Sequence, residues 1–419
     1  MITLNRRTFL TAGSIATLGA VTGLGTQMSL AAPGVPSDGD VVVLLFLRGG
    51  ADGLSLTPPI RDSAYYDLRP QIAIPQPGQA NGALPLTANG AVTYSAGFEG
   101  AFALHPAAKA LHDGLWADGK LAFIPGAGFK DTTQSHFTAT WNNYRGSLSL
   151  NVRGGWLGRM TSVQGGPGPL PSVHDSGARQ GTAGGPGTMG IVPSLNQFSG
   201  GTFRDARKAA LLASHGGDDS VSAMGRHLLS LSDGLGALQG GAREGYNDDA
   251  YGKRFSELAQ LLRADPPFGI RAAAIDVGKW DHHKDLGRPG DADGAFHRQT
   301  KEMCDAIQAF ADETNGLEGI TLVVASEFGR TTNENGNLGT DHGEGFTMMV
   351  AGGGIKGGVY GDDFADSLAL PQGRRRGSVP VATDYRKPIS ELIRKRAKVD
   401  DIAGIFPDFA PAGADLGLA

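Results

Sequence analysis

Three short apolar runs, at residues 41–47, 270–275 and 320–325, constrain the fold of this 419-residue chain more than any other feature. Each run has the length of a strand and is apolar at all or nearly all positions, which is typical of a strand buried on both faces of a parallel sheet. Helical periodicity over residues 295–314 separates the last two runs, and this alternation predicts βαβ units. We therefore expect an α/β fold with a doubly wound, mostly parallel sheet flanked by helices.

Weaker patterns complete this outline. Further strands are expected at 121–125 and 347–350, and helices at 105–119, from the region of residue 136 through 144, at 206–235, 251–262 and 385–398. The chain holds 65 glycines, so loops should be extensive, and residues 164–202 predict one long loop. We expect one α/β domain over residues 38–400, with insertions around 60–100 and 160–265 and a C-terminal tail at 401–419.

The first 32 residues resemble an export signal and are left out of the predicted fold. Asn5-Arg6-Arg7-Thr8-Phe9-Leu10 precedes a weakly apolar stretch and a small-residue cleavage site at 29–32, the form of a twin-arginine signal. The stretch is too short and too rich in glycine for a good membrane-spanning helix. The prediction is export through the twin-arginine translocase, a periplasmic or secreted location, and no stable membrane insertion after cleavage.

Charge and cysteine content narrow the function classes. The chain has 37 basic and 42 acidic residues. Cleavage of the leader would take away two arginines, so the mature part carries a net charge of about −7. This balance argues against nucleic acid or an anionic membrane as the main partner. The single cysteine, Cys304, excludes an internal disulfide and is expected to be a buried, inert thiol.

Acidic and histidine residues follow each of the three apolar runs. Ligands of open α/β sheets gather beyond the carboxyl ends of the parallel strands, so these residues are expected to meet there. Carboxylate and imidazole groups bind divalent ions such as Zn²⁺, Mn²⁺, Mg²⁺ and Ca²⁺. The candidate metal ligands are Asp52, Asp281, His283, Glu327, Asp341 and His342.

Two further residues are candidates for the chemistry itself. Ser135 precedes a predicted helix, whose N-terminus would stabilise negative charge near its oxygen, although a serine at a helix start usually only caps the helix. Thr132 and Thr133 are its competitors, and attack by metal-bound water is the alternative to a nucleophile. Arg330 could contact an anionic substrate or form a structural ion pair.

Several familiar motifs are absent or out of context. The chain has no G-x-S-x-G nucleophile elbow and no Cys-x-Pro-x-Arg or Ser-x-Pro-x-Arg sulfatase sequence. The glycine run at 352–358 matches G-x-G-x-x-G, but no helix pattern follows it, which argues against a nucleotide cradle.

Seven motifs together resemble the domain of unknown function 1501 family, exported by the twin-arginine route and placed in the alkaline phosphatase and sulfatase superfamily. They lie at residues 47–55, 135–137, 155–159, 280–283, 327–331, 339–343 and 352–358. The family typically shows Gly and Thr where this chain has Lys279 and His282. The superfamily implies an alkaline phosphatase-like core with one or two divalent ions.

The resemblance also implies roles for individual residues. Asp281, His283 and His342 would hold one ion, whereas Asp52, Ser135 and Glu327 would form the second set, with Ser135 as the nucleophile. Asp341 would be a ligand or a partner of one. The function expected is hydrolysis of an anionic phosphate or sulfate ester, and the alternative is a non-catalytic secreted scaffold or polymer-binding protein that keeps the fold.

Overall fold

The computed structural model describes most of the chain from residue 38 onward. The described residues are 26–30, 38–87, 92–130, 133–164, 189–192, 205–217, 226, 238, 241–264, 270–362, 377–411 and 413–419. Most of the predicted leader, most of the predicted loop at 164–202, and Thr132 lie outside these ranges. Within them, no helix is both long and apolar enough to cross a membrane.

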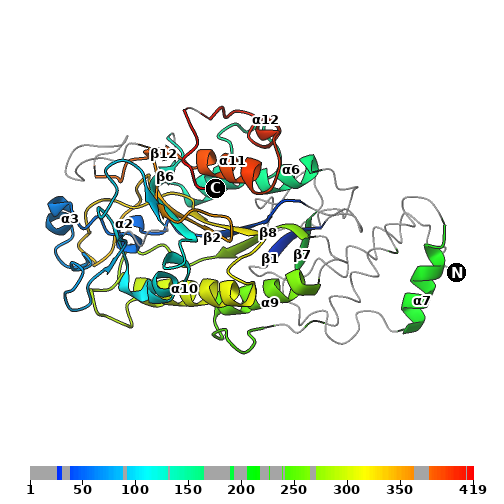
Figure 1. Ribbon diagram of the computed structural model, residues 1–419, viewed down its shortest axis with the longest axis horizontal. Helices are drawn as coiled ribbons and strands as arrows, with labels where there is room; N and C mark the ends of the chain where they lie inside the picture. Colours follow the sequence, from blue (N-terminus) through cyan, green and yellow to red (C-terminus); the bar gives the residue numbers. More distant parts are fainter. Residues whose placement is uncertain are drawn as a thin grey trace.

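A mixed, mostly parallel sheet forms the centre of the molecule (Figure 1). Its strand order is β4-β11-β6-β10-β9-β2-β8-β1-β7, and β12 pairs with β6. The strands are β1 (Thr26–Leu30), β2 (Val41–Leu47), β4 (Thr93–Tyr94), β6 (Leu121–Gly128), β7 (Met189–Val192), β8 (Ile270–Val277), β9 (Ile320–Ser326), β10 (Phe346–Gly352), β11 (Gly358–Val359) and β12 (Thr383–Asp384). A separate small sheet pairs β3 (Leu84–Pro85) with β5 (Ala103–Leu104).

The three predicted buried strands are neighbours at the centre of this sheet. Strand β2 pairs in parallel with β8 on one side and with β9 on the other. Strands β1 and β10 are antiparallel to their neighbours, so the sheet is mixed, but it is mostly parallel as the sequence predicted. The α/β class with helices on both faces is confirmed.

Helices cover both faces of the sheet (Figure 1). Helices α9 (Ala250–Ala264) and α10 (Ala295–Glu313) lie on one face, and α6 (Trp156–Val163), α11 (Arg386–Lys395) and α12 (Ile402–Ile405) lie on the other. The remaining helical segments are α2 (Gly53–Leu56), α3 (Ser63–Leu68), η1 (Pro106–Ala108), α4 (Lys109–Leu111), η2 (His112–Trp116), α5 (His136–Arg145) and α7 (Asp205–Ser214).

Strand β2 shows why its sequence is apolar without alternation. Val43, Leu45 and Leu47 belong to the core beneath α9 and α10, whereas the intervening Val42, Leu44 and Phe46 belong to the core beneath α6 and α11. Because successive side chains of a strand point to opposite faces, a strand covered on both faces must be apolar at every position.

Some segments differ from the pattern expected for them. Residues 105–119 form successive 3₁₀, α and π turns rather than one regular helix. Helix α9 lies in the range predicted as an insertion, yet Phe255 and Leu258 belong to a main core. Leu418, in the predicted C-terminal tail, is fully buried in the other core. Strand β1 lies inside the predicted leader and pairs with β8.

Candidate metal centre

The carboxyl ends of β2, β8 and β9 lie at one level of the sheet. Leu47 is in register with Val277 of β8 and with Ser326 of β9, so the loops that follow all three strands leave the sheet together. The Ser326 hydroxyl donates to the Leu47 carbonyl at 2.7 Å and accepts from the Ala51 nitrogen at 3.0 Å, which ties two of these loops together. The candidate site lies at this edge.

Gly49 lets the first loop approach the second. It adopts a φ of +126°, which side-chain-bearing residues rarely adopt, and a Cβ there would lie 2.4 Å from the backbone nitrogen of Asp281. The Gly49 N–H donates to Glu327 Oε1 at 2.8 Å. The glycine loop therefore packs directly against the loops that carry two of the predicted ligands.

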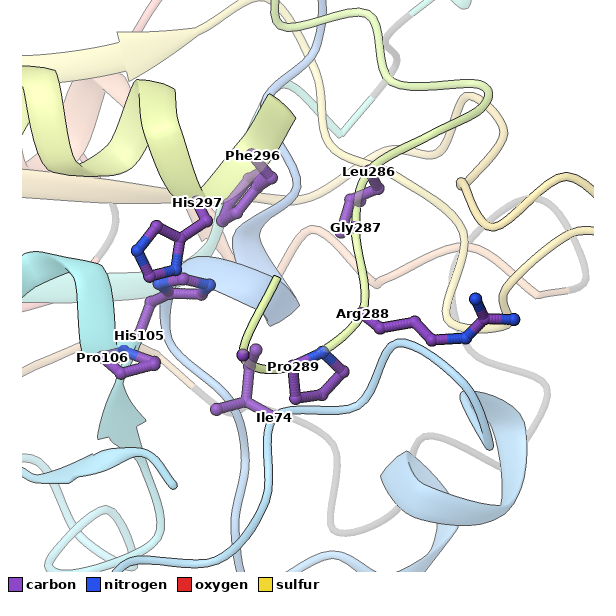
Figure 2. Close-up of a pocket in the computed structure, with 10 residues that line it drawn as sticks. Ile74, His105, Pro106, Leu286, Gly287, Arg288, Pro289, Phe296 and His297 are labelled. Atoms are coloured by element: carbon purple, nitrogen blue, oxygen red, sulfur yellow. The ribbon is translucent and has the colours of Figure 1, made fainter. Parts of the chain in front are cut away.

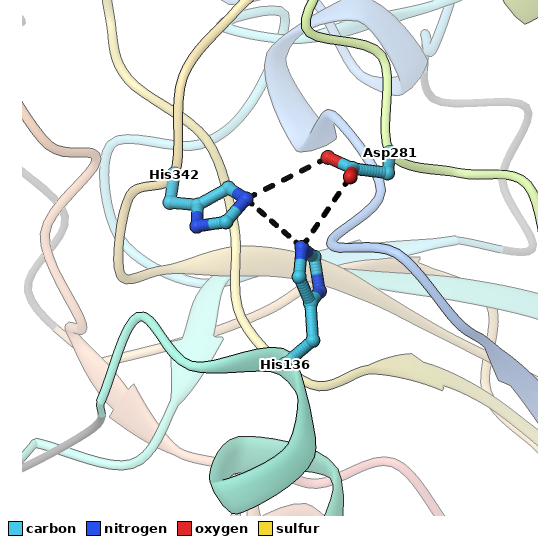
Figure 3. Close-up of side chains that lie close together, drawn as sticks. All are labelled: His136, Asp281 and His342. Carbon is cyan, nitrogen blue, oxygen red and sulfur yellow. Dashed lines mark hydrogen bonds and ion pairs between the residues drawn. The ribbon is translucent and has the colours of Figure 1, made fainter.

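Three histidine side chains converge on Asp281 (Figure 3 shows two of them with the aspartate). The Nε2 atom of His342 lies 2.9 Å from Nε2 of His136 and 2.9 Å from Nε2 of His283. Asp281 carboxylate oxygens lie 3.2 Å from His283 Nε2 and 3.6 Å from the Nε2 atoms of His136 and His342. The ligand atoms of His136, Asp281 and His342 lie within 4.8 Å of one another, close enough to hold one ion.

The other ring nitrogen of each histidine faces an oxygen acceptor. Nδ1 of His136 lies 2.8 Å from Glu327 Oε1, Nδ1 of His283 lies 3.0 Å from Asp341 Oδ1, and Nδ1 of His342 lies 2.9 Å from the Gln134 carbonyl oxygen. A ring that donates from Nδ1 to such an acceptor leaves the lone pair of its neutral form on Nε2. Lone pairs that face one another at 2.9 Å repel, and a cation between them would remove the repulsion.

Asp281 is held in its charged form by Arg330. Burial alone would raise the pKa of Asp281, but the hydrogen bond and the charge of Arg330 outweigh it, and the pKa is lowered. Arg330 Nη2 donates to Asp281 Oδ1 at 2.7 Å. Burial, together with the Arg330 charge, lowers the pKa of His342, so this ring is neutral at pH 7.

The contacts of Arg330 are nearly all internal. Its side chain is 1% exposed, and besides Asp281 it donates to the backbone carbonyls of Gly49, Gly50 and Thr340. A guanidinium committed in this way orients loops and a carboxylate. These contacts therefore favour a structural ion pair for Arg330 over direct contact with a substrate anion.

Asp52 lies apart from the histidine cluster in its contacts. Its Oδ1 accepts from Arg69 Nη1 at 2.9 Å and from the Ser55 backbone nitrogen at 2.8 Å, and its Oδ2 accepts from the Thr340 hydroxyl at 2.9 Å. Burial alone would raise the pKa of Asp52, but Arg69 and the hydrogen bonds outweigh this effect, and the pKa is lowered overall. Arg69 comes from the segment at 60–100, in which sequence patterns showed no chemistry.

The three residues expected to form a second ligand set are not joined by any contact that the structure records. Asp52 pairs with Arg69, Glu327 supports His136 and Gly49, and the Ser135 side chain is exposed at the start of α5. Ser135 does not cap the helix with its hydroxyl, which lies 3.5 Å from Thr138 Oγ1. The structure thus assembles one cluster, with Glu327 and Asp341 as partners of its histidines.

Sequence reasoning missed His136, although the motif that contains it was singled out for Ser135. The signal was present, because an imidazole in the first turn of a predicted helix beside a candidate nucleophile is itself a ligand candidate. The helix brings His136 to a cluster whose other members lie more than a hundred residues further along the chain.

Lys279 and His282, which depart from the family pattern, both occupy unusual positions. Lys279 has a φ of 76°, the left-handed region in which glycine is favoured. His282 is buried beside Trp280 and Phe296. Burial lowers the pKa of His282 to about 4, so the ring is neutral and packs against Trp280 and Phe296.

A small cavity lies outside the histidine cluster (Figure 2). It is lined by Ile74, His105, Pro106, Phe296, His297 and the loop 286–290, and it shares no residue with the cluster. His105 accepts a hydrogen bond from the Ala107 nitrogen, and burial lowers its pKa to about 3. These contacts are those of a packed structural histidine.

Fold and site together define an α/β protein with a histidine and aspartate cluster at the carboxyl ends of its central strands. The model of the family described as "Protein of unknown function (DUF1501)" matches residues 40–370, and the chain belongs to this family. No curated protein and no solved structure matches the chain significantly. The resemblance inferred from the seven motifs is thus confirmed at the level of the family.

Proposed function

We propose that this chain is an exported, metal-dependent hydrolase of phosphate or sulfate esters, with an alkaline phosphatase-like core. The observation that carries the proposal is the convergence of three imidazole Nε2 atoms on Asp281, each ring held through Nδ1 by an oxygen acceptor. Metal-binding histidines are typically held in this way by carboxylates or carbonyls.

The donor set fits one divalent ion. Three imidazoles and one carboxylate suit zinc or manganese better than calcium or magnesium, which prefer oxygen ligands. The carboxylates of Asp281, Glu327 and Asp341 and the guanidinium of Arg330 give the cluster a net charge of about −2, which one divalent ion neutralises. A second ion at Asp52 is not supported, because Arg69 already supplies the positive charge there.

The cluster is open to solvent on one side, which favours a catalytic over a structural site. Asp281 is 45% and His283 43% exposed at the side chain, whereas the supporting Glu327 is 1% exposed. Structural metal sites are closed by four protein ligands, whereas catalytic sites keep a position for water or substrate. A non-catalytic scaffold is therefore the second candidate.

Residue roles follow from the contacts. The bound ion would supply a Lewis acid for the ester oxygens and a lowered pKa for a bound water. His136, His283, His342 and Asp281 would bind it, and Arg330 is a positioning residue for Asp281. Ser135 is proposed as the nucleophile because its exposed hydroxyl directly precedes His136 at the N-terminus of α5, where backbone N–H groups favour negative charge.

The decisive experiment combines elemental analysis with a panel of aryl phosphate, phosphodiester and sulfate esters, with and without chelator. We expect about one zinc or manganese ion per chain and turnover that the chelator abolishes. His136→Ala and Asp281→Ala should lose both, whereas His112→Gln, a change at a surface histidine paired with Asp113, should lose neither.

The outcomes separate the proposals. Chelator-sensitive turnover that survives Ser135→Ala would assign attack to water rather than to the hydroxyl. Metal bound without turnover of any ester would favour the scaffold, and metal content unchanged in His136→Ala would show that the ion lies elsewhere. Export is tested separately, by locating the mature chain after Arg6→Lys and Arg7→Lys.

A further inference from the structure

An exposed aromatic residue directly follows one member of the cluster in the sequence. Phe137 directly follows His136 in the first turn of α5, and its side chain is 80% exposed. Among the described residues, the other exposed large apolar side chains are Leu150, Val163 and Leu212. None of these three adjoins a member of the cluster in sequence.

Helix geometry directs this ring toward the cluster end of α5. Side chains in an α-helix lean toward its N-terminus, and the N-terminus of α5 is the part that reaches the cluster. Gln134, just before the helix, contacts His342 twice, through its carbonyl oxygen and through its side-chain nitrogen. Gln134 and His136 thus contact the cluster directly, and Phe137 is the exposed apolar side chain that follows them.

The polar side chains of Gln134 and Arg330 form most of their hydrogen bonds within the protein. The side chain of Gln134 donates to the His342 carbonyl, and the donors of Arg330 go to backbone carbonyls and to Asp281. Small-molecule sites are commonly apolar surfaces with a few polar groups that orient the ligand. Here the cluster supplies the polar part, and the Phe137 ring supplies apolar surface at its rim.

We propose that Phe137 is a specificity-determining residue that packs against the organic part of the substrate, and that the substrate is an ester of an aromatic alcohol. The inference rests on the proposed function for the reaction, but it makes a claim about binding that can be tested without turnover. An aromatic ring gains from edge or offset stacking in addition to burial, so an aryl group is favoured over an alkyl group of similar size.

The test compares two non-hydrolysable anions, phenylphosphonate and methylphosphonate, by calorimetric titration of the zinc-loaded full chain. Wild type should bind phenylphosphonate about tenfold more tightly, since covering roughly one face of the ring is worth about a factor of ten. Phe137→Ala should lose this preference without changing methylphosphonate binding, and Phe137→Tyr should keep it. Leu150→Ala, a change at an equally exposed apolar residue away from the cluster, should match wild type.

Equal affinities in wild type, a preference that survives Phe137→Ala, or no binding of either phosphonate would each overturn the inference. Its failure is distinct from that of the proposed function. Chelator-sensitive ester turnover without the phenyl preference would leave the hydrolase and remove the Phe137 subsite. A preference that depends on Phe137, without turnover of any ester, would leave the subsite and remove the hydrolase.

Discussion

Replacing Glu327 with glutamine tests whether the cluster is a metal centre held together by buried partners. The Glu327 side chain is 1% exposed, and its Oε1 lies 2.8 Å from both His136 Nδ1 and the Gly49 nitrogen. A glutamine has the same shape, but its amide is neutral and its nitrogen is a donor. It would therefore weaken the acceptor that fixes the proton of His136 on Nδ1 and leaves Nε2 free for the ion.

The expected loss is a 10- to 100-fold weaker affinity for zinc, the range found when a carboxylate behind a metal-binding histidine is changed. This corresponds to about 1.4–2.8 kcal/mol. Asp341→Asn is the matched control, because Asp341 supports His283 in the same way but is 60% exposed at its side chain, so its contact is partly replaced by water. We expect its effect to be several-fold smaller.

The assay is competition for zinc against a chromophoric chelator, with the circular dichroism spectrum as a check that the fold is intact. An affinity within about threefold of wild type for Glu327→Gln would refute the reasoning, since His136 would then not depend on its carboxylate partner. A loss equal to that of Asp341→Asn would refute the argument from burial.

Two further predictions concern stability. Arg69→Met should reduce the free energy of unfolding in urea at pH 7 by about 3–5 kcal/mol, because Asp52 would be left buried and unpaired; the double variant with Asp52→Asn should lose less, and an equal loss would contradict the pairing. Burial raises the pKa of Asp276 to about 6, against the lowering effect of the 2.6 Å Tyr144 hydrogen bond. Between about pH 4 and 6 the folded chain keeps a proton that the unfolded chain releases, so Asp276 lowers stability as the pH rises. Asp276→Asn should therefore gain on the order of 2–3 kcal/mol relative to wild type between pH 4 and pH 7, and a constant difference between the two chains would exclude this effect.

Part of the cluster's placement was predictable from the sequence. The continuous apolar runs predicted buried central strands, and the acidic and histidine residues that follow them were expected at one edge of the sheet, where the structure brings Asp281, His283 and His342 together. That these three residues bind one ion is what the family resemblance implies, and it stays part of the proposed function.

The sequence by itself determined the α/β class, the central strands and the family, since apolar periodicity and short motifs are local properties. Only the tertiary structure decided that His136 joins the cluster, that Glu327 and Asp341 support histidines, and that Asp52 pairs with Arg69. The sequence shows that a residue is acidic, but not whether its carboxylate faces an ion, an imidazole or a guanidinium. Which of these it meets depends on contacts between residues far apart in the chain, and those exist only once the loops have packed.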